Sequence, residues 1–153
     1  MAEAELSVDF ADGEHPLWRG LEAGLAEALA AAARAEGVSG LVAVLLGDDD
    51  AVAALNAQWR SRPGPTNVLS FPAPEGAPAA DVRFLGDIAL AAQTIAKEAD
   101  SQGKSFEAHA AHLIVHGFLH LLGYDHGEAS AAAAMEARER DVLAQLGIAD
   151  PYA

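Results

Sequence analysis

Three closely spaced histidines carry the most evident chemistry of this sequence. His116, His120 and His126 lie at relative positions 0, 4 and 10. A helix turns once per ~3.6 residues, so the first two imidazoles leave one face of a helix one turn apart. Gly123 lies where that helix would end, because glycine readily adopts the left-handed conformation that closes many helices. The chain can then reverse and bring His126 toward the other two, which predicts a site for one Zn²⁺ ion with a fourth position left for water.

The histidine spacing resembles the long zinc-protease motif H-E-x-x-H-x-x-G-x-x-H, with a change at its second position. Gly117 occupies the place of the glutamate that acts as general base in those proteases. The ligand pattern is retained, while the residue that activates water for peptide hydrolysis is absent. A zinc metallopeptidase-like hydrolase is therefore an alternative that this glycine weakens. Another alternative is three histidines that pack in a core or cap a helix without a metal.

The same block, H-G-F-L-H-L-L-G-Y-D-H, resembles the signature of the YbeY family of bacterial metal-dependent endoribonucleases, which are rRNA maturation factors. Further stretches resemble that family in the same order along the chain: Arg60 with 65–72, then 85–88, then 135–147. Together they cover most of the chain from about Leu55 onward.

The resemblance implies a zinc-dependent, single-strand-specific endoribonuclease that acts in 16S rRNA 3′-end maturation and ribosome quality control. It points to Arg60 and His116 as catalytic residues and to His116, His120 and His126 as the metal ligands. A guanidinium suits phosphodiester cleavage because its fork pairs two oxygens and stays protonated. Zinc lowers the pKa of bound water to about 7, so metal-bound water or hydroxide is expected to assist the reaction, as attacking group or as base. Arg60 is also explained as a cation at the negative end of a helix.

Other polar residues near the histidines have less specific readings. Asp87 and Asp125 can orient ligand histidines, and each is equally well explained by a turn or a main-chain cap. His112 lies on the histidine helix in a very apolar segment, so we expect a hydrogen-bonded neighbour rather than a fourth ligand. Met135 is expected to pack in the core rather than to form a turn beneath the metal.

Length and composition predict one folded domain over residues 1–153. Of these residues 52% are hydrophobic and none is cysteine, so histidine and carboxylate are the strong metal ligands at hand. The start of the chain has no basic segment followed by an apolar run, and no stretch approaches ~18 strongly apolar residues. We therefore expect a cytoplasmic protein with no membrane partner.

The charge limits how this protein can bind nucleic acid. Nine Lys and Arg residues against 23 Asp and Glu give a net charge of −14, whereas RNA binding needs a basic footprint. We expect single-stranded RNA, including rRNA, as substrate and do not expect DNA. Five basic residues of the middle third would form a local basic groove: Arg60, Arg62, Arg83, Lys97 and Lys104. The acidic remainder can suit a basic ribosomal protein, so a non-catalytic ribosome assembly factor with a structural zinc is a further alternative.

The resemblance implies an α+β domain in which a mixed sheet of about four strands packs against several helices, including a zincin-like metal helix. Hydrophobic periodicity by itself supports the list of elements. Strands are expected at 6–10, 41–46, 68–71 and 82–90. Helices are expected from Pro16 to near Gly37, at 48–60, 91–101 and 128–146, and from the N-cap Ser105 to Gly123. The run 41–46 is expected to be buried on both faces. Flanking prolines place 68–71 at an edge, where a strand can hold an extended substrate.

Overall fold

The computed structural model describes residues 6–60, 66–73, 83–124 and 129–152, with only the backbone of residues 59 and 60. Within these ranges four strands form one sheet in the order β1-β2-β4-β3. Their bounds are β1 Leu6–Asp12, β2 Gly40–Gly47, β3 Val68–Pro72 and β4 Phe84–Ala91. The pairs β1–β2 and β2–β4 are parallel, and β3 is antiparallel to β4. The mixed four-stranded sheet and the edge position of β3 are confirmed.

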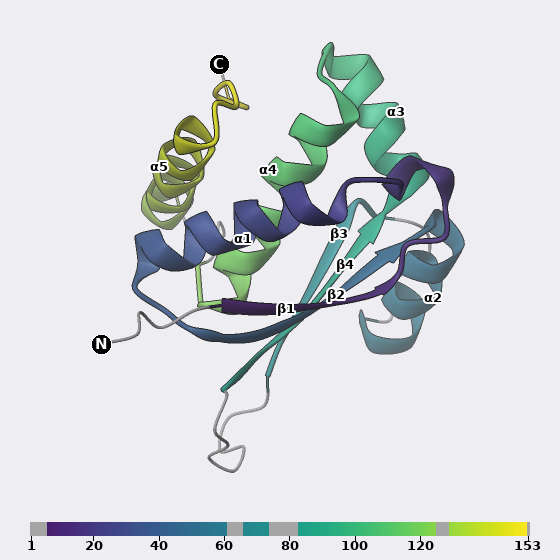
Figure 1. The fold of residues 1–153 in the computed structure, drawn as a ribbon, viewed down its shortest axis with the longest axis horizontal. Helices are drawn as coiled ribbons and strands as arrows, with labels where there is room; N and C mark the ends of the chain where they lie inside the picture. Colours follow the sequence, from purple (N-terminus) through teal and green to yellow (C-terminus); the bar gives the residue numbers. More distant parts are fainter. Residues whose placement is uncertain (1–5, 61–65, 74–82, 125–128, 153) are drawn as a thin grey trace.

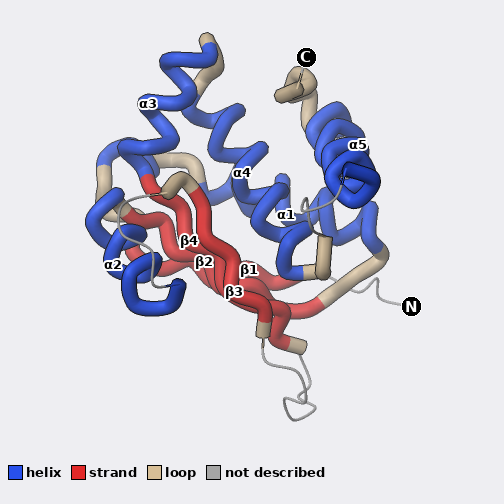
Figure 2. Tube along the Cα trace, turned by 180° about the vertical axis from the view of Figure 1, so that it is seen from behind, coloured by secondary structure: helices blue, strands red, loops and turns tan. Residues whose placement is uncertain are grey.

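The helices lie on both faces of this sheet. Their bounds are η1 Pro16–Trp18, α1 Glu22–Glu36, α2 Asp49–Arg60, α3 Ala92–Gln102, α4 Phe106–Leu121 and α5 Ala129–Gln145. Figure 1 shows α1, α4 and α5 on one face and α2 on the other, and Figure 2 shows the same layers from behind. Helix α4 contacts β3, β4, α1, α3 and α5, so it is the central helix that its apolar sequence predicts. No described helix is both long enough and apolar enough to span a membrane.

The two faces of the sheet are covered unequally. One face of β2 is fully buried, at Val42, Val44 and Leu46. The residues that alternate with these are half-buried: Leu41, Ala43 and Leu45. The prediction that this strand is buried on both faces is wrong, because α2 is the helix that contacts the second face and covers only part of it. A hollow of about 550 Å³ remains there.

The first predicted helix is divided into η1 and α1. Gly20 has a φ of +77°, a left-handed conformation that ends the first turn before α1 begins. The indole Nε1 of Trp18 donates to the carbonyl of Gly47 at 2.9 Å, which fixes η1 against the end of β2. The sequence predicted the starting proline and the apolar spacing correctly, but not this break.

Helix α4 approaches the sheet very closely at two glycines. A Cβ on Gly117 would lie 3.0 Å from Ser70 Oγ and 3.2 Å from Ile88 Cγ2, and Ser70 Oγ donates to the Gly117 carbonyl at 2.9 Å. Gly86 of β4 has a φ of +144°, and a Cβ there would lie 2.8 Å from Cδ2 of Leu121. This close packing fixes α4, and with it the histidines, against β3 and β4.

Candidate metal centre

Helix α4 presents three histidines on successive turns of one side. Its start is fixed by Ser105, whose hydroxyl accepts a hydrogen bond from the backbone N–H of Ala108 at 3.1 Å, as predicted for an N-cap. After Leu121 the chain turns at Gly123, which has a φ of +101°. The predicted helix with its terminal glycine is therefore confirmed.

The two histidines predicted from the spacing point toward each other. The Nε2 atoms of His116 and His120 lie 3.2 Å apart, with ring centroids 4.6 Å apart. Two nitrogens that each lie about 2.0–2.1 Å from a tetrahedral zinc ion are separated by roughly 3.3–3.4 Å. The pair therefore fits two ligands of one ion.

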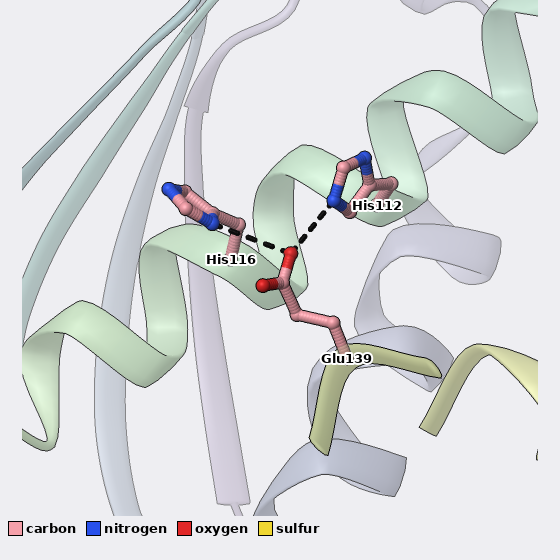
Figure 3. Close-up of side chains that lie close together, drawn as sticks. All are labelled: His112, His116 and Glu139. Atoms are coloured by element: carbon pink, nitrogen blue, oxygen red, sulfur yellow. Dashed lines mark hydrogen bonds and ion pairs between the residues drawn. The ribbon is translucent and has the colours of Figure 1, made fainter. Parts of the chain in front are cut away.

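A buried carboxylate on α5 completes the surroundings of His116. Glu139 is fully buried, and its Oε1 lies 2.7 Å from Nε2 of His112 and 3.3 Å from Nδ1 of His116. Figure 3 shows this carboxylate between the two imidazole rings, reaching across from α5 to α4. The Tyr152 hydroxyl donates to the same oxygen at 2.9 Å.

The protonation of this cluster follows from its hydrogen bonds. Burial alone would raise the pKa of Glu139, but hydrogen bonds from His112, His116 and Tyr152 outweigh it and lower the pKa to about 2. The ionised carboxylate can only accept, so His116 donates to it from Nδ1, while Nε2 is the atom that faces His120. A carboxylate that holds a histidine in this way is typical of metal ligands.

A second set of donor atoms involves the same histidine. One ligand atom from each of His112, His116 and Glu139 lies within 4.8 Å of the others, so this group could hold a metal ion. The distance of 2.7 Å between His112 Nε2 and Glu139 Oε1 is that of a direct hydrogen bond. We therefore interpret the carboxylate as support for His116, whose Nε2 faces Nε2 of His120.

The remaining predicted site residues divide into three groups. His126 and Asp125 lie outside the described residues, so the third ligand stays a prediction. Arg60 ends α2, and its side chain is also outside the description. Asp87 borders the hollow on the α2 side, while its neighbour Ile88 packs against Gly117 of α4. Alternate residues of a strand face opposite ways, so this placement does not favour the reading in which Asp87 orients a histidine of α4.

Glu139 is the site residue that sequence reasoning missed. It lies four residues after Met135 and four before Leu143, both buried, so it occupies the core stripe of α5. A carboxylate in such a stripe needs buried partners, and that position was the available signal. Met135 itself packs in the core, as predicted.

Two of the described residues expected in the basic groove lie near opposite ends of β4. Arg83 directly precedes β4, whereas Lys97 lies in α3, which follows β4. Strand β4, eight residues and roughly 26 Å long, lies between them in the chain. Arg62 and the side chain of Arg60 lie outside the description.

Comparison with known proteins adds independent information. A family model described as endoribonuclease YbeY matches residues 9–147. Proteins named endoribonuclease YbeY include one from Rhodopseudomonas palustris (strain BisB18), 56% identical over 83% of this chain and 77% of its own length. Another, from Chelativorans sp. (strain BNC1), is 52% identical over 81% and 77% respectively. The solution structure of TM1509 from Thermotoga maritima has a TM-score of 0.61 at 24% identity, covering 93% of this chain and 91% of that one, and supports the fold.

Proposed function

Because this chain belongs to the YbeY family of endoribonucleases, we propose that it cleaves single-stranded RNA at a zinc ion held by His116, His120 and His126. The proposed cellular role is 16S rRNA 3′-end maturation and ribosome quality control in the cytoplasm. A basic ribosomal protein is a proposed partner, because the net charge of −14 favours a basic surface.

The observation that carries the zinc proposal is the convergence of two imidazole nitrogens on one point. Nε2 of His116 and Nε2 of His120 have the separation of two ligands of a tetrahedral ion, and Glu139 keeps the proton of His116 on the opposite nitrogen. His126 would provide the third imidazole nitrogen.

The chain would divide the chemistry between the ion and its own side chains. A zinc ion bound there supplies Lewis acidity toward a phosphoryl oxygen and a coordinated water of lowered pKa. Glu139 holds the ring of His116 in place, and Arg60 is proposed to pair the non-bridging phosphate oxygens. Strand β3 lies at the edge of the described sheet and contacts α4, and we propose that an extended substrate lies along it.

The packing of α4 disfavours the peptidase alternative. In the zinc-protease motif a glutamate follows the first histidine, and here Gly117 is already in close contact with Ser70 and Ile88 of the sheet. A glutamate side chain at this position would point into β3 and β4 and not toward the ion. The geometry therefore supports a hydrolase that does not use this base.

The proposal is tested by removing and restoring the metal. Protein stripped with a chelator and checked by elemental analysis should not cleave an unstructured RNA, and added zinc should restore cleavage while a duplex of the same sequence stays intact. His120→Ala protein, purified in parallel, serves as the control for contaminating nucleases. Undiminished cleavage by verified metal-free protein would reject the proposal.

The role of Arg60 separates an enzyme from a passive assembly factor. Arg60→Ala should lower the rate of RNA cleavage by roughly 10²–10³-fold, the usual cost of losing a charge-stabilising donor. Arg83→Ala is the matched control, because Arg83 is exposed at the far end of β4 from α3. Unchanged processing of 16S rRNA in cells that carry a folded Arg60→Ala protein would favour the assembly factor.

A further inference from the structure

The segment that follows α5 returns to the metal centre. The hydroxyl of Tyr152 lies 2.9 Å from Oε1 of Glu139 and 3.2 Å from Nε2 of His112. The Tyr152 ring meets the His112 ring edge-on, with centroids 5.4 Å apart. None of the sequence patterns around the histidines includes this tyrosine.

Contacts with α5 and with the connection between α3 and α4 hold this segment in place. Asp150 accepts hydrogen bonds from the backbone N–H of Tyr152 at 2.8 Å and from Nε of Arg140 at 3.1 Å. The Arg140 guanidinium lies over the Tyr152 ring, 5.2 Å from its centroid. Nζ of Lys104 donates to the Pro151 carbonyl at 3.4 Å. These contacts fix the turn at residues 150–152 in a position that brings the Tyr152 hydroxyl within hydrogen-bond distance of Glu139.

The hydrogen bonds of Glu139 are concentrated on one of its two oxygens. Oε1 accepts from His112, His116 and Tyr152, whereas Oε2 is buried and has no hydrogen-bond partner among the described residues. The two histidines approach from the same helix, and the tyrosine is the donor that comes from elsewhere in the chain. The tyrosine hydroxyl thus adds a third donor to the oxygen that already faces the two histidines of α4.

We infer that Tyr152 is a positioning residue of the metal centre: its hydroxyl orients Glu139, and Glu139 in turn keeps the proton of His116 on Nδ1. The inference rests on the proposed role of His116 as a ligand through Nε2. Tyr152 does not touch the ion or the RNA; it acts through the carboxylate. If Tyr152 had only a structural role, it would pack this segment against His112 and Arg140, and the aromatic ring without its hydroxyl would be enough for that.

Tyr152→Phe separates the two roles, because it keeps the ring and removes the hydroxyl. In metal-free protein, the ¹⁵N shifts of the His116 ring report which nitrogen carries the proton, and we expect a larger fraction with the proton on Nε2. We also expect the zinc affinity, measured by competition with a chromogenic chelator, to fall about three- to tenfold. This is a smaller fall than the one expected when a residue that directly contacts a metal ligand is lost. Arg140→Gln, which releases the turn but leaves the hydroxyl, should shift both readouts in the same direction.

Tyr124→Phe is the matched control. It also removes a tyrosine hydroxyl that donates to a carboxylate, Oε2 of Glu36 at 3.1 Å, but this carboxylate belongs to α1. It should leave the His116 ring shifts unchanged. Wild-type His116 shifts and zinc affinity in folded Tyr152→Phe and Arg140→Gln proteins would overturn the inference. If instead the zinc-loaded wild type failed to cleave RNA while Tyr152→Phe still weakened zinc, the proposed function would fail and the positioning role would stand.

Discussion

At the scale of single residues, the centre combines a pair that is local in sequence with a partner that is not. His116 and His120 are four residues apart on one helix, so their spacing predicted their meeting. Glu139 is 23 residues from His116, and its contact depends on how α5 packs against α4. Its burial could have been suspected from the core stripe of α5, but its histidine partners could not.

Glu139→Gln tests whether the carboxylate supports the metal ligand. The amide cannot accept three donors as an anion does, so we expect zinc to bind roughly 10–100-fold more weakly, as for other lost partners of metal-ligating histidines. Zinc affinity by chelator competition measures this. Glu98→Gln is the matched control, because Glu98 makes a similar contact with His109 of the same helix at 2.9 Å. An equal loss in both variants would contradict the specific role of Glu139.

His109 should make stability depend on pH. Burial lowers its pKa, and the hydrogen bond to Glu98 only partly opposes this shift. The unfolded chain, with a histidine pKa of about 6.5, therefore takes up protons before the folded protein does as the pH falls. Its contribution to the free energy of unfolding is complete above about pH 6.5 and decreases as the pH falls toward the lowered value. Urea denaturation from pH 7.5 to 5 should show this decrease, and His109→Gln should flatten it; an unchanged slope would exclude His109 as the cause.

At the scale of elements, the close contact between α4 and the sheet sets the position of the site. The alternation and the helical periodicity predicted every strand, and every helix except the first, to within about two residues of its bounds. They did not predict the break at Gly20 or the half-open face of β2, because both depend on neighbours far away in the sequence. The order of the strands in the sheet could not be predicted from the hydrophobic pattern either, because β2 pairs with β4, about 40 residues further along the chain.

Gly86→Ala should disturb this contact strongly. The new Cβ would lie 2.5 Å from the Phe71 carbonyl and 2.8 Å from Leu121, in a backbone conformation that suits glycine. We expect a loss of about 3 kcal/mol or more in the free energy of unfolding, from strain and overpacking together. Gly103→Ala is the control: it has a φ of +68° with no atom within 4 Å of the new Cβ, so about 1 kcal/mol is expected. Similar urea midpoints for the two variants would argue against a steric origin.

At the scale of the whole molecule, the acidic charge should limit how the protein holds RNA. The chain has nine Lys and Arg residues. Within the described part of the chain, Arg138 is in an ion pair with Glu36 and Arg140 with Asp150. Composition predicts a weak basic footprint, and this stays a prediction. Its grouping into one groove could not be read from positions along the chain, because β4 separates Arg83 from Lys97.

RNA binding should therefore depend only moderately on salt. Each phosphate contacted on a single strand contributes about −0.7 to the slope of log K against log salt, so two to four contacts give roughly −1.5 to −3. Fluorescence anisotropy with a short single-stranded RNA, at constant zinc and 50–300 mM KCl, measures this slope. A value near −6 would indicate a basic surface that the described residues do not provide.

The nearness of His116 and His120 within one helix also bears on the order of folding. Only one helical turn has to form before these two nitrogens approach each other, whereas Glu139 and Tyr152 arrive when distant segments come together. If the pair binds zinc as proposed, a newly made chain can capture the ion on an isolated α4. Refolding from urea should then be faster with zinc present from the first moment than with zinc added afterwards.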